Sequence, residues 1–321
     1  MSSIKIGIIG AAGYTGGELL RILIHHPHAE IVFANSRSQA GKPVYETHTD
    51  LLGDTDLVFT DALPFEETEV IFLCSGHGQS RIFLEQHAVP DSVRIIDLST
   101  DYRDESEGFV YGLPELNRER IRTARKVANP GCFATTIQLA LLPLARAHRL
   151  GEVHVSAVTG STGAGQALSA ATHFSWRNNN VSVYKAFTHQ HLAEIRRSVQ
   201  QLQAGFSEDI NFLPYRGNFA RGIMANVYLD FEGSLQEARQ LFETFYAEHP
   251  FTHISNRPID VKQVVNSNKC ILELQKEGKK LLITSITDNL LKGASGQAVQ
   301  NMNLMFGQAE KTGLYLKTIS F

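Results

Sequence analysis

Residues 4–24 read IKIGIIGAAGYTGGELLRILI and decide the fold of the N-terminal half. The nearly continuous apolar run at 4–9 predicts a strand that is buried on both faces of a parallel sheet. Apolar residues at helical spacing over 18–24 predict a helix. Between them lies a turn of spacing G-x-x-G-x-x-G, whose candidate binding residues are Gly10, Ala12, Gly13, Tyr14, Thr15 and Gly16. Such a turn lets backbone approach a pyrophosphate at a helix N-terminus, so we favour dinucleotide binding over a plain tight turn.

Further buried strands are predicted at 30–34, 70–74, 94–98 and 126–128. Strands that alternate with helices indicate an α/β, doubly wound (Rossmann) domain. Ligands of such sheets bind beyond the carboxyl ends of the strands. The loops there therefore supply further candidates for cofactor binding, namely Ser36, Arg37, Ser75, Gly76 and Ser99.

The loop after the second strand bears on the choice of cofactor. It carries Ser36, Arg37 and Ser38 and has no acidic residue. An acid there usually binds the ribose 2′-hydroxyl of NAD, whereas an arginine suits a 2′-phosphate. The loop therefore favours NADP(H) over NAD, although Arg37 can also be read as a solvated loop residue.

The pattern changes from about residue 151. Strands are predicted at 152–159, 223–229, 269–274 and 280–286, with one main helix at 234–248. This indicates an α+β domain with an antiparallel or mixed sheet, one face of which is free to pack against another domain or subunit. We assign 1–149 plus 288–321 to the NADP-binding domain, with Asn289 near the nicotinamide. We assign 150–287 to the α+β catalytic and oligomerisation domain.

The stretch Asn129-Pro130-Gly131-Cys132 follows a strand and precedes an apolar helical segment at 136–150, so Cys132 should lie where a helix begins. A helix N-terminus favours an anion, and the anion of cysteine is the nucleophilic thiolate. Cysteine is also among the most buried residue types. Position alone leaves nucleophile and core residue about equal. Cys74 and Cys270 lie within predicted strands and are interpreted as core residues.

Histidines occur in two groups. His189 and His191 stand at the start of a helix that is predicted to run to about residue 203, where they could converge on one site. A histidine is the usual proton carrier near pH 7. The segment alone nevertheless favours a pair of surface histidines. His25, His26 and His28 lie near the end of the first helix, and we prefer a structural role there over a metal site.

The composition and the absence of certain motifs argue against several classes of function. The net charge of −3, without a basic run, argues against nucleic acid as a partner. The most apolar stretch, 137–145, is too short to span a membrane. Three widely spaced cysteines suggest reduced thiols in a cytoplasmic compartment. No CxxC or HExxH pattern indicates a metal site.

Several motifs together resemble the N-acetyl-γ-glutamyl-phosphate reductase family of arginine biosynthesis, within the wider layout of the semialdehyde dehydrogenases. They cover the chain in order and are Gly10-Ala11-Ala12-Gly13-Tyr14-Thr15-Gly16, Asp97-Leu98-Ser99, Tyr111-Gly112-Leu113-Pro114-Glu115, Asn129-Pro130-Gly131-Cys132, His189-x-His191-x-x-Glu194 and Lys292-Gly293-Ala294-Ser295-Gly296-Gln297-Ala298. The chain departs from the family where Phe133-Ala134-Thr135 replaces Tyr-Pro-Thr. Gln190 and Ala193 replace an arginine and a proline of the histidine motif.

The resemblance implies NADPH-dependent reduction of an acyl phosphate to a semialdehyde with release of inorganic phosphate. It implies Cys132 as nucleophile, His191 as acid/base with His189 assisting, and Asn129 and Glu194 at the substrate. Arg103 and Arg221 are candidates for binding phosphate or carboxylate, because a planar guanidinium suits both. Either arginine could instead be a surface charge. A homo-oligomer, dimer or tetramer, is expected, with no membrane partner.

Three alternatives remain open. The same chemistry could act on an N-succinyl-glutamyl or aminoadipyl phosphate, since the acyl group cannot be read from the sequence. Aspartyl phosphate is disfavoured, because the aspartate-semialdehyde dehydrogenases favour Asn-Cys where this chain has Gly131-Cys132. In a different class, the chain would be a non-enzymatic NADPH-binding regulator whose Cys132 is structural or redox-sensing.

Overall fold

The computed structural model describes residues 3–318, which form two compact units. The first unit comprises the chain up to Pro130 together with Ala294–Tyr315, and the second comprises Gly131–Gly293 together with the chain from Leu316. These boundaries differ from the domain limits predicted at 149/150 and 287/288. The main difference is the helix after Cys132, which packs against helices and strands of the second unit and so belongs to it.

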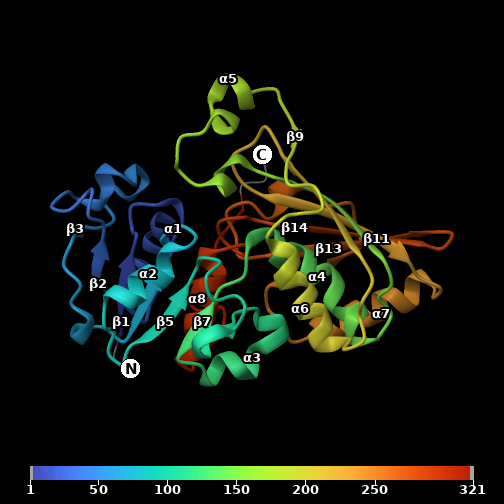
Figure 1. Cartoon of the computed structure of the whole chain (residues 1–321), viewed down its shortest axis with the longest axis horizontal. Coiled ribbons are helices and arrows are strands. Elements are labelled where there is room, and N and C mark those ends of the chain that lie inside the picture. The colour runs from blue at the N-terminus through green and yellow to red at the C-terminus, as the bar shows by residue number, and fades with distance from the viewer. Residues whose placement is uncertain (1–2, 319–321) are drawn as a thin grey trace. The chain divides into compact units, whose positions relative to one another are not determined.

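The first unit contains a seven-stranded sheet of order β3-β2-β1-β4-β5-β7-β6, in which every neighbouring pair is parallel (Figure 1). The predicted doubly wound sheet is therefore confirmed. Its strands are β1 (Ile4–Ile9), β2 (Ala29–Asn35), β3 (Phe59–Thr60), β4 (Val70–Leu73), β5 (Arg94–Asp97), β6 (Val110–Tyr111) and β7 (Lys126–Ala128).

Successive residues of a strand point to opposite faces of the sheet. Because the strands of this sheet are apolar on both faces, helices cover it. Ile9, Ile71 and Leu73 share one apolar cluster with Phe83 and Leu84 of α2. On another part of the unit, α8 contacts α1, α3 and β5. The helices are α1 (Tyr14–Leu23), α2 (Gln79–Gln86), α3 (Pro114–Thr123) and α8 (Ser295–Met305).

The second unit contains a mixed seven-stranded sheet of order β12-β13-β14-β11-β8-β10-β9. The pairs β10–β8 and β12–β13 are parallel and the others antiparallel, which confirms the predicted mixed sheet. Its strands are β8 (Val153–Thr159), β9 (Ser182–Val183), β10 (Ile210–Arg216), β11 (Ile223–Asp230), β12 (Thr252–Ser255), β13 (Cys270–Glu277) and β14 (Lys280–Thr287).

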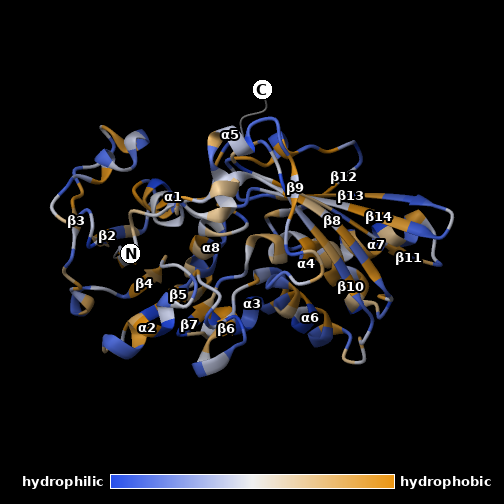
Figure 2. Cartoon of the chain, turned by 45° about the horizontal axis from the view of Figure 1, so that its top comes forward, coloured by the Kyte–Doolittle hydropathy of each residue, from blue (hydrophilic) through white to orange (hydrophobic). Residues whose placement is uncertain are grey.

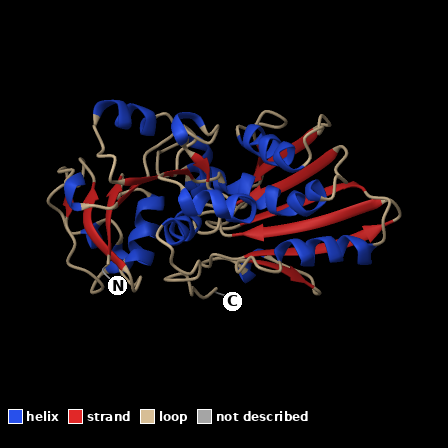
Figure 3. Cartoon of the chain, turned by 90° about the horizontal axis from the view of Figure 1, so that it is seen from below, coloured by secondary structure: helices blue, strands red, loops and turns tan. Residues whose placement is uncertain are grey.

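Helices α4 (Cys132–Arg146), α6 (His191–Leu202) and α7 (Leu235–Tyr246) pack on this sheet, and Figure 3 shows helices in front of its strands. Helix α4 is buried along almost its whole length. Helices α6 and α7 bury one side only, and Figure 2 shows both hydrophobic and hydrophilic residues along them. The short α5 (Phe174–Arg177) lies in a long excursion between β8 and β9.

Side chains alternate in burial along β8 and β11. Such alternation fits a sheet whose one face packs against helices while its other face is more open. Within residues 3–318, no helix combines the length and the hydrophobicity that crossing a membrane requires.

Candidate active site

The glycine turn connects β1 to α1 as predicted, and each glycine has a physical reason. Gly10 has φ +76°, in the left-handed region, and lies against the backbone of Cys74. A Cβ on Gly16 would come within 2.6 Å of the Ala11 backbone, so glycine allows helix and turn to pack closely. Gly13 is the residue before α1 and contributes no side-chain cap, which leaves backbone N–H groups at the helix start. The turn therefore fits a dinucleotide pyrophosphate.

The remaining turn residues and the end of β2 complete this edge of the sheet. Ala12 precedes α1, while Tyr14 and Thr15 are its first residues. After β2, Ser36 is buried and its N–H donates to the Thr60 carbonyl. Arg37 is exposed and forms no ion pair within the described chain.

The ends of β4 and β5 carry Cys74, Ser75, Gly76 and Ser99. Cys74 follows the last residue of β4 and is half-buried, so it lies at the end of the strand rather than within it as predicted. Burial of the thiol raises its pKa to about 12, which disfavours a reactive thiolate there. The Ser99 hydroxyl donates to Asp97 at 2.8 Å. Burial raises the pKa of the Asp97 carboxyl, while hydrogen bonds from the Ser99 N–H and hydroxyl oppose that shift. The residues predicted to line the cofactor crevice thus do lie beyond the strand ends.

Asn129 and Arg103, predicted at the substrate, take part in one buried network of the first unit. Asn129 donates from Nδ2 to the Ala294 carbonyl at 3.0 Å, and its Oδ1 accepts from Asn301 at 3.0 Å. Arg103 donates from Nε to the Asn129 carbonyl at 2.9 Å and from Nη2 to the Leu98 carbonyl at 3.2 Å. Both side chains therefore hold protein backbone in place.

In the second unit, Cys132 is the first residue of α4, as predicted. The preceding Gly131 is extended, with φ −71° and ψ 153°, and no side chain caps the helix. The thiol residue is half-buried. Gly293 lies against it, since a Cβ there would come within 2.8 Å of the Cys132 Cβ. A half-buried cysteine at an open helix start has the environment of a reactive thiol.

The histidine motif lies beside this turn. Both His189 and His191 are buried, at 4 % and 5 % exposed, so the interpretation as surface histidines is wrong. Their ring centroids lie 4.6 Å apart, and the Phe133 ring makes edge contacts with both. His189 Nδ1 accepts the His191 N–H, which turns the chain into α6. The two rings thus converge, which the sequence had left as the less favoured alternative.

Glu194 joins the two parts of this site. One carboxylate oxygen accepts the Gly131 N–H at 3.1 Å, and the other lies 3.8 Å from His191 Nε2. The residue is 5 % exposed. Glu194 therefore connects the turn before Cys132 with the His191 ring.

The two histidines differ in the charged groups that surround their imidazole rings. Burial, and then the charges of Lys185 and Arg216, lower the pKa of His189 to about 4. His189 is therefore neutral near pH 7. With Nδ1 accepting a hydrogen bond, its proton lies on Nε2. His189 can donate a hydrogen bond, whereas His191 is the histidine beside a carboxylate.

Arg221 and Asn289 occupy structural positions in the second unit. Arg221 donates from Nε and Nη2 to both oxygens of Asp288, at 3.0 and 3.1 Å. Asp288 is fully buried. Asn289 accepts the Gly222 N–H at 2.7 Å and donates to the Thr162 hydroxyl at 2.9 Å. Through its bond to Thr162, Asn289 holds the loop after β8 in place.

Other residues of this site were missed from the sequence. Tyr184 packs its ring 5.7 Å from His189, and Arg216 lies over the Tyr184 ring at 4.6 Å. Tyr184 and Arg216 are brought together by the pairing of β9 with β10, which the sequence did not predict. The alternating Ile210 and Phe212 were a signal, but Pro214 weakens a strand prediction.

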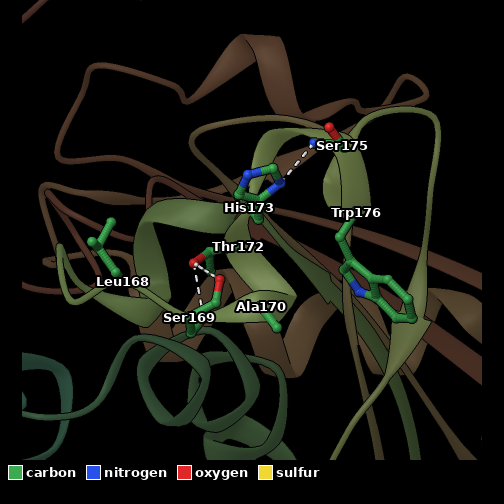
Figure 4. A pocket seen from close by; sticks show the side chains of 7 residues that line it. All are labelled: Leu168, Ser169, Ala170, Thr172, His173, Ser175 and Trp176. Carbon is green, nitrogen blue, oxygen red and sulfur yellow. Dashed lines mark hydrogen bonds between the residues drawn. The ribbon is translucent and has the colours of Figure 1, made fainter.

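A separate pocket lies in the excursion around α5 and contains none of the predicted site residues (Figure 4). Leu168, Phe174 and Trp176 of this excursion are exposed. The pocket is lined by Leu168, Ser169, Ala170, Thr172, His173, Ser175 and Trp176.

A Rossmann unit with a nucleotide-binding turn, joined to a unit with a cysteine and histidines, defines a nicotinamide-nucleotide-dependent oxidoreductase. Residues 5–124 match the semialdehyde dehydrogenase NAD-binding domain, and residues 132–289 match the semialdehyde dehydrogenase dimerisation domain. The chain belongs to the semialdehyde dehydrogenase family.

Relatives and solved structures agree with this family. An N-acetyl-gamma-glutamyl-phosphate reductase from Parabacteroides distasonis is 57% identical over 321 residues, covering 99% of this chain and 100% of the relative. One from Christiangramia forsetii is 56% identical, covering 98% of both chains. The crystal structure of aspartate semialdehyde dehydrogenase II from Vibrio cholerae has a TM-score of 0.77 at 17% identity, covering 96% of this chain and 99% of that one. The structural likeness confirms the fold.

Proposed function

We propose that this chain catalyses the NADPH-dependent reduction of N-acetyl-γ-glutamyl phosphate to N-acetylglutamate semialdehyde, with release of phosphate, in arginine biosynthesis. The observation that carries the proposal is the link from Gly131 through Glu194 to His191 beside the half-buried Cys132. The full-length relatives named above carry the name of this activity. We place the enzyme in the cytoplasm as a homo-oligomer, consistent with three unbridged cysteines and a matched dimerisation domain.

In the proposed mechanism, the Cys132 thiolate attacks the acyl-phosphate carbonyl carbon. The bond to the phosphate oxygen breaks, phosphate leaves with the bonding electrons, and a thioester remains on Cys132. Backbone N–H groups at the start of α4 are available to hold the developing oxyanion. The Gly131 N–H is already bound to Glu194 and is not one of them.

When bound, NADPH would supply the hydride that reduces the thioester carbon, and the glycine turn from Gly10 to Gly16 together with Arg37 would hold it. His191 donates a proton to the resulting oxyanion and takes it back as the hemithioacetal collapses. The carbon–sulfur bond then breaks, which releases the aldehyde and restores the thiolate. Glu194 stabilises the charged imidazole during this exchange, while the neutral His189 orients the segment through its bond to the His191 N–H.

The preference for NADP(H) rests on Arg37. Its exposed guanidinium stands after β2 without an ion-pair partner in the described residues, and no acid occupies this loop. A 2′-phosphate would supply the missing anion. The open glycine turn fits the pyrophosphate of either nucleotide.

The proposal is tested by running the reaction backwards. N-acetylglutamate semialdehyde, NADP⁺ and phosphate are supplied, and NADPH is followed by its absorbance. We expect phosphate-dependent NADPH formation by the wild type and a loss on the order of 10³-fold or more in Cys132→Ser. Cys270→Ser, which changes a buried cysteine of β13, is the matched control and should retain activity. A folded wild type that binds NADP⁺ but forms no NADPH would exclude this function.

A further inference from the structure

The end of strand β14 lies next to the helix that carries Cys132. Helix α4 begins at this cysteine and packs against β14. Thr287 is the last residue of the strand, and Asp288 follows it. Both residues are fully buried. Because buried polar groups that are fully hydrogen-bonded make the surrounding structure rigid, the partners of these two residues show what the end of β14 holds in place.

Thr287 holds the first turn of α4 through a chain of two hydroxyl groups. The Thr136 hydroxyl donates to the Cys132 carbonyl at 2.9 Å, and the Thr287 hydroxyl lies 2.6 Å from the Thr136 hydroxyl. A threonine hydroxyl has a single proton to donate. Because Thr136 gives its proton to Cys132, the proton between the two hydroxyl groups comes from Thr287. The strand therefore supplies a donor to the helical turn that begins with Cys132.

A second hydroxyl of β14 binds the same helical turn. Ser285 lies two residues before Thr287, so its side chain is on the same face of the sheet. Its hydroxyl donates to the Thr136 carbonyl at 2.8 Å and lies 3.5 Å from the Cys270 sulfur of β13. Thr136 is therefore bonded to β14 through both its side chain and its backbone. Apolar packing has no preferred direction, whereas these hydrogen bonds fix the position of the helix start along the strand.

The opposite side of Cys132 is closed by the turn that follows β14. The Asp288 carboxylate accepts the Leu290 and Leu291 N–H groups at 2.8 and 3.2 Å. The Asp288 backbone carbonyl accepts the Gly293 N–H at 2.9 Å. This bond places Gly293 against the Cys132 side chain, at the close approach described above. A displacement of the helix start towards this turn would therefore bring Cys132 into the Gly293 backbone.

The turn itself has little freedom to move. Besides the two bonds from Arg221, the Asp288 carboxylate accepts the Asn266 N–H at 2.7 Å. A buried carboxylate that is ion-paired and bonded to several N–H groups is costly to displace. Cys132 thus lies between a fixed turn and a helix start whose position depends on the Thr287 hydroxyl.

We propose that Thr287 is a positioning residue for the Cys132 thiolate and acts through Thr136. By fixing the first turn of α4, Thr287 keeps the thiolate at the open helix start, where backbone N–H groups stabilise it. This inference rests on the proposed function for the part that Cys132 plays in turnover, but not for the reactivity of its thiol.

The first test needs no substrate. Alkylation of Cys132 by iodoacetamide is followed by mass spectrometry of its peptide over a range of pH. Thr287→Val keeps the shape of the side chain and removes the hydroxyl. Its alkylation rate near neutral pH should fall roughly two- to fivefold, and the midpoint of the pH profile should move to higher pH, because the thiolate is held less well at the helix start. Thr287→Ser, which keeps the hydroxyl, should restore most of both.

The matched control is a buried threonine of the first unit. The Thr68 hydroxyl donates to the Phe65 carbonyl at 2.8 Å, so Thr68→Val also removes one buried hydrogen bond. This variant should leave the alkylation profile of Cys132 unchanged. A purely structural role of Thr287 would lower the melting temperature of Thr287→Val and leave the midpoint of its profile where the wild type has it. That result would overturn the proposal.

Thr136→Val tests whether the effect passes along the chain of hydroxyl groups. It breaks the same chain at the other member, so it should slow alkylation at least as much as Thr287→Val. The double variant should be no slower than Thr136→Val alone, because both changes then interrupt one path. Effects that multiply in the double variant would overturn the transmission through Thr136. Thr136→Val also decides the proposal if Thr287→Val does not fold.

The second test measures turnover in the reverse reaction. Thr287→Val should lower kcat about tenfold or more and change KM for the semialdehyde by no more than about twofold, because a misplaced nucleophile slows the reaction without removing a substrate contact. A higher KM at unchanged kcat would overturn the positioning role. A wild type that is inactive with the semialdehyde, while Thr287→Val still slows alkylation, would refute the proposed function and support the positioning of Cys132.

Discussion

His189 should make the second unit less stable in mild acid. Its pKa is about 4 in the folded protein, against 6.5 for an unperturbed histidine. Because the unfolded chain binds the proton more readily, stability falls as pH decreases from about 6.5 towards 4 and is unaffected above that window. At pH 5.0 these two pKa values give a loss of about 2 kcal/mol relative to pH 7.5.

The variant for this test is His189→Asn, because the asparagine Oδ1 can still accept the His191 N–H while no group titrates. A unit of this size loses about 2–4 °C of melting temperature per kcal/mol, so the wild type should lose about 4–8 °C more than the variant between pH 7.5 and 5.0. Thermal unfolding at both pH values measures the difference. His253→Asn, at an exposed position of β12, controls for removal of a surface imidazole.

An equal loss of melting temperature in wild type and His189→Asn would refute the reasoning. It would mean that His189 is as easily protonated in the folded protein as in the unfolded chain. The assignment of His191 as the acid/base would then lose its electrostatic support, because both histidines could carry the proton near pH 7.

Other substitutions test separate parts of the structure. Gly293→Ala would place a Cβ within 2.8 Å of the Cys132 Cβ, so activity should fall and stability drop by about 1–3 kcal/mol; Gly205→Ala, where the space is open, should change neither. Arg37→Ser should raise KM for NADP⁺ by roughly 10-fold or more and leave that for NAD⁺ nearly unchanged, and equal effects on both would contradict a 2′-phosphate contact. Arg221→Gln should destabilise the protein by about 3 kcal/mol in thermal unfolding, because the buried Asp288 carboxylate would keep its backbone N–H donors but lose its ion-pair partner; a higher substrate KM at unchanged stability would instead support a role at the substrate.

The first unit was readable from the sequence because its signals are local. Strands buried on both faces are continuously apolar, so β1 at Ile4–Ile9 and β7 at Lys126–Ala128 were predicted with their observed bounds. The glycine turn is equally local, since a left-handed φ and a close approach each require glycine. The helices α2 and α3 were not predicted, and α3 has a non-helical residue inside it.

The second unit was harder because its organisation depends on contacts between distant residues. Residues 133–145 of helix α4 are all buried, so no single apolar face of the segment reveals the unit it packs against, and the predicted limit at 149/150 was placed after it. The same difference between local features and long-range contacts applies to the residues of the candidate active site. The position of Cys132 at a helix start is local, whereas the Arg216–Tyr184 contact depends on the pairing of β9 with β10.

The two most specific motifs lie where the chain passes between the units, at Pro130/Gly131 and at Gly293/Ala294. In the first unit the two crossing segments lie side by side, because Asn129 of one segment donates to the Ala294 carbonyl of the other. The two crossing segments are also in contact in the second unit, where Gly293 lies against Cys132. Each motif must therefore satisfy close contacts in both units within a few residues. That double requirement explains why these short stretches, rather than the longer helices, carry the most distinctive sequence, and why the proposed nucleophile stands at one of them.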